Sequence, residues 1–229
     1  MIKVPLVAHS TDTLAQFHVL PYAPWGKDYP YQPHVEVALG HTGDSLLLHF
    51  RVIEQTVRAV APGDNSRVWE DSCCEFFASP IQALSSLESK PGQAGGLFVP
   101  SCEQEHCGTL YYNFECNAAG RLLIGCGSGR EGRELARKEI LDSVERWSSL
   151  GKSPFEEHEA PEEWHLKLAI PITAFWHHQL HSFSGLRMKT NIYKCGDKLR
   201  QPHFLSLFPI STATPDFHRP DFFQELIFE

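Results

Sequence analysis

The stretch VWEDSCCEFF, residues 68–77, places acids and a hydroxyl ahead of a strand-like run that contains one further acid, Glu75. Side chains alternate between the two faces of a β-strand, so Glu75 points away from Cys74 and Phe76. A carboxyl group buried in such a run is costly unless it is solvated or paired. We therefore expect a strand here, with either a wet cleft or a polar partner at Glu75.

Runs of the same β-type recur along the whole chain and are bounded by Gly, Pro, Asn and Asp. They are HVEVAL (34–39), SLLLHFRV (45–52), SCCEFF (72–77), LYYNFECN (110–117), RLLIGC (121–126), WHLKLAI (164–170), RMKTNIYK (187–194), HFLSLF (203–208) and ELIF (225–228). Helical patterns cover 134–147 and 171–180 and do not alternate regularly with the strands, which argues against a doubly wound α/β fold. The pattern predicts an all-β sandwich with one or two short helices.

Length and charge limit the function classes. With 229 residues, of which 42% are hydrophobic, the chain suits one sizeable core, and we expect a single domain over 1–229. The net charge of -8, without a basic cluster interleaved with aromatics, disfavours a nucleic-acid partner. No run reaches the roughly twenty apolar residues of a membrane span. The start lacks a secretory signal, which predicts a cytoplasmic protein as written, or an exported one if a leader was removed.

Seven cysteines form an odd set without regular spacing, and several lie inside strand-like runs, so free thiols are expected. Cys102 and Cys107 flank His106 but lack a second ligand pair for a zinc site. His177 and His181 have the spacing of two ligands on one helix face but no third ligand nearby. No metal site is therefore expected from these motifs.

Polar residues gather on one face of two further strands. Alternation in the run 110–117 puts Asn113, Glu115 and Asn117 together, and in the run 187–194 it puts Arg187 and Asn191 together. A merely solvated sheet face has the same alternation. These side chains, however, are planar groups that make several hydrogen bonds each, whereas a solvated face would be richer in Lys, Thr and Ser. The pattern favours a polar binding surface.

The segments VWEDSCCEFF, YYNFECNAAG, WHLKLAIP, RMKTNIYKCGD, HFLSLFPI and DFHRPDFFQELIFE, in this order, resemble the family 9 carbohydrate-binding modules, especially stand-alone family 9-like domains. The resemblance extends from about Trp25 to Glu229. It implies an antiparallel β-sandwich of jelly-roll type that binds a mono- or oligosaccharide without catalysis. It also implies that two aromatics enclose the sugar ring. Structural calcium occurs in the family, but the chain has no Asp/Asn-rich loop of calcium-binding spacing, so no cofactor is expected from a motif.

The resemblance assigns roles to individual residues. It matches Trp69 to the first stacking aromatic and Glu75 to the acid that binds sugar hydroxyls, with Asn113 and Asn117 in the corresponding strand. In one straight strand, Trp69 and Glu75 would lie about 20 Å apart, too far to hold one ring. The turn-forming residues between them are therefore expected to fold Trp69 back over the strand.

The second stacking tryptophan of the family has no counterpart near the C-terminus. The segment FHRPDFF offers Phe217 and His218 instead, and these two residues are predicted to form the second wall of the site. They precede a proline that fixes the backbone in a loop. Phe222 and Phe223 lead into the last strand and are expected to cap the core.

Two other functions remain open at this point. Glu75 and Glu115 could be neighbours, and a pair of carboxylates is what glycoside hydrolysis requires. A family member that has lost sugar binding would carry the same fold. Non-catalytic binding explains the same residues without tuned pKa values, and it is the function that the sequence favours.

Overall fold

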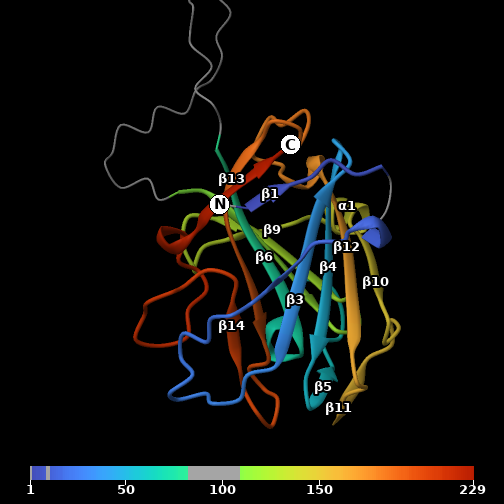
Figure 1. The fold of residues 1–229 in the computed structure, drawn as a ribbon, viewed down its shortest axis with the longest axis vertical. Helices are drawn as coiled ribbons and strands as arrows, with labels where there is room; N and C mark the ends of the chain where they lie inside the picture. Colours follow the sequence, from blue (N-terminus) through green and yellow to red (C-terminus); the bar gives the residue numbers. More distant parts are fainter. Residues whose placement is uncertain (1, 9–10, 82–108) are drawn as a thin grey trace, which may run out of the picture.

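A computed structural model describes residues 2–8, 11–81 and 109–229 (Figure 1). An eight-stranded sheet has the order β1-β15-β13-β6-β7-β8-β9, with β14 also paired to β13. Its strands are β1 (Ile2–Val4), β6 (Cys73–Ile81), β7 (Tyr111–Asn117), β8 (Leu122–Gly127), β9 (Glu134–Leu135), β13 (Arg187–Cys195), β14 (Phe204–Ser206) and β15 (Gln224–Phe228). All its pairings are antiparallel except β1 with β15.

The second layer is a five-stranded antiparallel sheet of order β10-β12-β4-β3-β2, whose longer strands run side by side in Figure 1. Its strands are β2 (Phe17–Val19), β3 (His34–His41), β4 (Ser45–Ile53), β10 (Glu145–Ser148) and β12 (Trp164–Pro171). A separate pair is formed by β5 (Thr56–Ala59) and β11 (Phe155–Glu159). The predicted antiparallel β-sandwich is confirmed, and each of the nine predicted runs contains a strand.

Helical structure is limited to short segments. They are α1 (Lys138–Ser143) and the 3-10 turns η1 (Thr11–Thr13), η2 (Val68–Glu70), η3 (Ile172–Ala174) and η4 (Pro220–Phe222). The prediction of a helix over 134–147 is wrong at both ends, and only Lys138–Ser143 is helical. The flanking residues form strands β9 and β10, which pair with the edges of the two sheets. In the described part of the chain, no helix has the length and apolar character needed to cross a membrane.

The main core lies between the two sheets. Along β12, buried residues alternate with partly exposed ones, as expected for a strand with one face on the core. The buried residues are Trp164, Leu166, Leu168 and Ile170. Phe76 of β6 and Phe114 of β7 join the same cluster from the other sheet, with ring centroids 6.2 Å apart. Each such side chain contributes about 1.5 to 3 kcal/mol on full burial.

A buried ion pair also connects the two sheets. Glu54, just after β4, lies 2.9 Å from Nζ of Lys194 on β13, and both side chains are fully buried. Glu54 also accepts a 3.0 Å hydrogen bond from the indole of Trp164. Lys194 donates to the carbonyl of Cys195 and contacts the ring of His203. This cluster fixes the end of β13 that carries Cys195.

A second apolar cluster covers the outer face of the eight-stranded sheet. Phe77, Tyr111 and Tyr193 belong to it, and loop residues Trp25 and Phe217 pack over them. The central strands β6 and β7, and β13 from Thr190 onward, are therefore buried on both faces. As a result, polar residues on the outer face, which alternation alone would place in solvent, are enclosed.

The five cysteines in the described part of the chain are free and buried, as expected: Cys73, Cys74, Cys116, Cys126 and Cys195. Cys102, His106 and Cys107 lie outside the described residues. His177 and His181 do not share a helix face, because the helical turn of this region ends at Ala174.

Candidate functional site

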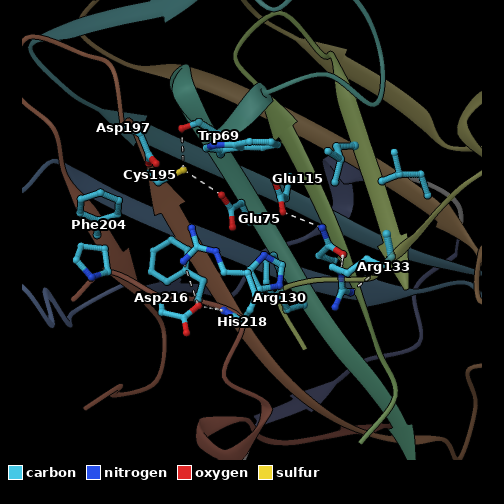
Figure 2. A pocket seen from close by; sticks show the side chains of 17 residues that line it. Trp69, Glu75, Glu115, Arg130, Arg133, Cys195, Asp197, Phe204, Asp216 and His218 are labelled. Carbon is cyan, nitrogen blue, oxygen red and sulfur yellow. Dashed lines mark hydrogen bonds and ion pairs between the residues drawn. The ribbon is translucent and has the colours of Figure 1, made fainter. Parts of the chain in front are cut away.

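A cavity of about 430 Å³ opens on the outer face of the eight-stranded sheet (Figure 2). Its floor is built from β6, β7, β8 and the end of β13. Its walls come from η2, from the turn between β8 and β9, and from residues 215–218. Segments that are far apart in the sequence therefore converge on one enclosure.

Trp69 lies at the rim of this cavity. It sits in η2, and the chain turns before β6 begins at Cys73, so Trp69 and Glu75 line the same space. The expected turn between the two residues is therefore present. The carbonyl of Trp69 accepts a 3.2 Å hydrogen bond from the amide of Asp197. The indole is half-buried, with part of its surface in the second apolar cluster and part on the cavity.

Two glutamates form the polar centre of the floor. Glu75 on β6 and Glu115 on β7 are register partners, and both side chains project into the cavity beside each other (Figure 2). Burial, followed by the charge of Glu115, raises the pKa of Glu75 well above its usual range. Burial also raises the pKa of Glu115, to about 7. The pair therefore retains at least one proton near neutral pH.

A chain of hydrogen bonds orients Glu115. Arg133 donates from Nε to Oδ1 of Asn113 at 2.9 Å, and Asn113 donates from Nδ2 to Oε1 of Glu115 at 2.8 Å. The Arg133 guanidinium also donates to the carbonyls of Tyr111, Gly125 and Gly129. The second carboxyl oxygen of Glu115, Oε2, is buried without a protein partner. It is an acceptor available to a bound molecule.

Gly125 leaves space for the hydrogen bonds that join Arg133, Asn113 and Glu115. A Cβ atom there would lie 2.7 Å from Oδ1 of Asn113 and 3.2 Å from Nε of Arg133. Both atoms are held by hydrogen bonds and cannot move away freely. A side chain at this position of β8 would displace Asn113 and with it Glu115.

The side of the cavity next to β13 carries a thiol and another acid. Sγ of Cys195 lies 3.0 Å from Oε1 of Glu75. Asp197, two residues further on, lines the cavity, and burial raises its pKa to about 6. Arg130, which also lines the cavity, is exposed, and its Nη1 lies 3.6 Å from Oδ1 of Asp216. The cavity lining thus contains both acidic and basic side chains.

Both residues predicted for the second wall line the cavity. Phe217 is almost fully buried and stacks on Tyr193, with ring centroids 4.1 Å apart and planes within 5°. Nδ1 of His218 lies 2.9 Å from the hydroxyl of Tyr111. Burial, together with Arg133 and Arg130, lowers the pKa of His218 to about 3, so its ring is neutral. Phe204 of β14 supplies another half-buried ring at this wall.

The other three predicted site residues lie away from the cavity lining. Asn117 donates to Asp71 Oδ2 at 2.9 Å, and its Oδ1 accepts from the backbone of the following turn. Asn191 is buried, and its side-chain amide bonds both backbone groups of Phe208. Arg187 is exposed at the far end of β13 and is ion-paired with Glu225. These residues fix loops or strand edges instead of facing the cavity.

Sequence reasoning did not assign binding roles to Glu115, Arg130, Arg133, Asp197 or Phe204. A signal existed for Glu115, which shares a strand face with Asn113. For the arginines, the sequence offers GSGREGR at 127–133, which by itself indicates only a turn. Asp197 and Phe204 reach the cavity through the pairing of β13 with β14, which strand alternation does not reveal.

Comparison with known proteins agrees with this architecture. The sequence model of carbohydrate-binding family 9 matches residues 9–88 and 96–228. The chain belongs to carbohydrate-binding family 9. A search of curated proteins gave no match.

Solved structures of similar proteins have the same fold. A protein from Bacteroides uniformis ATCC 8492, named for an inferred role in carbohydrate binding, is 42% identical, with a TM-score of 0.82 over 100% of this chain and 98% of its own. Two family 9 modules from Caldicellulosiruptor kristjanssonii are each 10% identical. One, in complex with glucose, has a TM-score of 0.50 over 99% of this chain and 95% of its own. The other, in complex with cellotriose, has a TM-score of 0.53 over 100% and 93%.

The structural calcium that the family resemblance implies can be compared with the side chains present. Among the described residues, three potential metal ligands lie close together: Cys73, Glu75 and Cys195. Two of the three are thiols, which do not suit a cation that prefers oxygen ligands. A separate group of oxygens surrounds Arg146, whose guanidinium donates to Asp64 Oδ1 at 2.8 Å and to the carbonyls of Gly120 and Leu141. An arginine already supplies the positive charge there, so calcium does not fit this group.

Proposed function

We propose that this protein binds a pyranose sugar non-catalytically in the cavity beneath Trp69. The main support is that the half-buried indole of Trp69 and the buried carboxyl groups of Glu75 and Glu115 line the same cavity. Oε2 of Glu115 has no protein partner there. Aromatic faces suit the C–H patches of a sugar ring, and carboxyl groups suit its hydroxyls. The cavity volume of about 430 Å³ falls in the range of small-ligand sites.

The polar groups divide the recognition of hydroxyls between them. Glu115 accepts a hydroxyl at Oε2, and the protonated Glu75 can either donate or accept. Asn113 and Arg133 hold Glu115 in place, so little side-chain freedom is lost when the sugar binds. A sugar that cannot pair these buried groups would leave them unsatisfied, which gives the site its selectivity.

Isothermal titration calorimetry with glucose, galactose, cellobiose and cellotriose, followed by a glycan array, tests this proposal. The probes include the two sugars bound by the Caldicellulosiruptor modules. Binding below about 10 mM, equivalent to roughly 3 kcal/mol, supports the proposal. No binding of any sugar at that concentration contradicts it and favours a family member without a working site.

A glycoside-processing enzyme is the second candidate, favoured by the register pairing of Glu75 and Glu115. Directly opposed side chains on neighbouring strands have Cβ atoms roughly 4.5 to 5.5 Å apart. The carboxyl groups of retaining glycosidases are about 5 to 5.5 Å apart. A retaining enzyme, however, needs one ionised carboxylate as nucleophile, whereas burial raises the pKa of both groups here.

An assay of reducing-sugar release separates the two candidates. The wild-type protein and Glu75→Gln are incubated with cellotriose and with aryl glycosides at several pH values. Release by the wild type but not by the variant would establish the enzyme. Binding without release would establish the non-catalytic function.

A further inference from the structure

Three potential metal ligands meet beneath the rim of the cavity. Sγ of Cys73, Sγ of Cys195 and a carboxyl oxygen of Glu75 all lie within 4.8 Å of one another. Cys73 and Glu75 are two residues apart on β6 and therefore share a face. Cys195 is the direct register partner of Cys73 on β13. The sheet itself thus holds the three donors together.

The cluster is buried but borders the cavity. Cys73, Cys195 and Glu75 are 0%, 1% and 2% exposed, and the last two line the cavity. Asp197 lines it beside them, so a further oxygen donor lies on the open side. A cation could reach the donors through the cavity without opening the sandwich.

We infer that Cys73, Cys195 and Glu75 form a binding site for a thiophilic divalent cation such as Zn²⁺ or Cd²⁺, with the fourth position open to the cavity. Two thiolates and a carboxylate suit zinc, with bonds of about 2.3 Å to sulfur and about 2.0 to 2.2 Å to oxygen. Donors on one tetrahedral ion lie about 3.5 to 3.8 Å apart. The three donors now lie within 4.8 Å of one another, so binding requires their largest separation to shorten by about 1 Å.

Binding follows a balanced exchange of protons for metal. Two metal–sulfur bonds and one metal–oxygen bond form, while the S–H bonds of Cys73 and Cys195 and the O–H bond of Glu75 break. The three protons pass to the buffer. No oxidant or reductant takes part. The inference does not depend on sugar binding, because the metal alone is the probe.

The competing explanation is that the two thiols only fill the second apolar cluster, to which both cysteines belong. Buried Cys commonly behaves as a small apolar residue. A second competitor is a disulfide, since Cys73 and Cys195 are opposed across the strands. These two explanations and the metal site give different results in one experiment.

The experiment uses the full chain in a Cys102→Ser/Cys107→Ser background, which removes the other thiols that could bind metal near His106. The protein is reduced, freed of reductant and chelator under anaerobic conditions, and titrated with Cd²⁺. We expect one equivalent to bind, with a near-ultraviolet thiolate-to-metal absorption band and the release of protons. Zn²⁺ alone should raise the melting temperature, and excess Zn²⁺ should compete with Cd²⁺ for the site.

Variants at the ligands and at one matched thiol complete the test. Cys195→Ser should abolish the absorption band, and Glu75→Gln, which keeps the side-chain volume, should weaken Cd²⁺ binding at least about tenfold. Cys126→Ser, a buried free thiol in the main core, should leave the band unchanged. If Cys195→Ser does not fold, Glu75→Gln decides the question alone. Absence of the band in the background protein, an unchanged affinity in Glu75→Gln, or loss of two free thiols to a disulfide under these conditions would overturn the inference.

Discussion

Glu75 and Glu115 face each other across the β6–β7 pairing, and each side chain is at most 4% exposed. Two like-charged groups in this position cannot both ionise easily in a buried environment. Hydrogen bonds offset part of the cost of burying the two carboxyl groups. The thiol of Cys195 donates to Glu75, and Asn113, held by Arg133, donates to Glu115. The acid pair is therefore held in a preorganised state, and its protonation should connect pH with stability and, under the proposed function, with sugar binding.

The first prediction concerns the pH dependence of stability. The pKa of Glu115 is raised from 4.5 to about 7 by burial, so the folded state holds a proton that the unfolded state loses at lower pH. The free energy of unfolding should consequently fall as pH rises from about 4.5 to 7, by up to about 3 kcal/mol from this residue. Urea unfolding with EDTA present should show a smaller fall in Glu115→Gln. Glu139→Gln, an exposed substitution on α1, should keep the wild-type dependence.

Sugar binding should respond to pH in the opposite direction. A sugar hydroxyl that donates to Glu115 Oε2 favours the ionised carboxylate and therefore lowers its pKa. We expect the association constant to rise as pH increases through about 7, with proton release on binding. Calorimetry in buffers of different ionisation enthalpy measures both effects. A weaker association at higher pH would mean that the protonated acid is the donor to the sugar.

Trp69 should contribute more to binding than to folding. Its indole is half-buried at the cavity rim, so Trp69→Ala should cost less than the about 3 to 5 kcal/mol typical of a buried aromatic. Sugar affinity should fall at least about tenfold, or about 1.4 kcal/mol. Trp147→Ala is the matched control, because Trp147 is 49% exposed on β10 of the other sheet. A stability loss at Trp69 in the full core range would assign it to packing.

The strand runs and their faces could be predicted from the sequence because they depend on local alternation. The split of Asn113 and Glu115 from Tyr112 and Phe114 is an example, and it is present in the structure. The turn between Trp69 and Glu75 could be predicted because a straight strand would place the two residues about 20 Å apart, too far to contact one sugar ring. Family membership followed from the ordered motifs.

The partners of each polar side chain could not be predicted, because they depend on strand order and register. Asn117 and Asn191 lie on the expected polar faces but are occupied by Asp71 and Phe208. Arg187 is paired with Glu225 on β15, a contact set by the register of two distant strands. The pairing of Glu75 with Glu115 likewise required β6 and β7 to be neighbours in one register.

The ion pair between Glu54 and Lys194 should be sensitive to the loss of one partner. Lys194→Met leaves the buried carboxylate of Glu54 unpaired, and we expect a loss of about 3 to 5 kcal/mol in the free energy of unfolding. The double variant Lys194→Met/Glu54→Gln should recover part of this loss. Chemical denaturation of the two variants measures the difference. Equal stability of the single variant and the wild type would show that the pair is solvated in the folded protein.

The aromatic residues of the wall opposite Trp69 should have two different roles. We expect Phe217 to stabilise the fold, and Phe204 and His218 to contact the ligand. Phe217 is 9% exposed and is stacked on Tyr193, so Phe217→Ala should lower the free energy of unfolding by about 3 kcal/mol or more. Phe217, which was predicted for the second wall of the site, therefore contributes to the packing of that wall. Phe204 is half-buried on the cavity, and Phe204→Ala should weaken sugar binding with a smaller loss of stability.

His218, like Phe204, is expected to contact the ligand more than it stabilises the fold. The pKa of His218 is about 3, so its ring stays neutral and its contribution to binding should not change between pH 5 and 8. His218→Ala should weaken binding, whereas Phe222→Ala is the control, because that ring contacts Arg219 outside the cavity lining. Calorimetry and thermal unfolding are compared for all four variants. If Phe204→Ala and His218→Ala bind sugar like the wild type, Trp69 is a stacking surface without an opposing wall, and the acid pair must carry the selectivity.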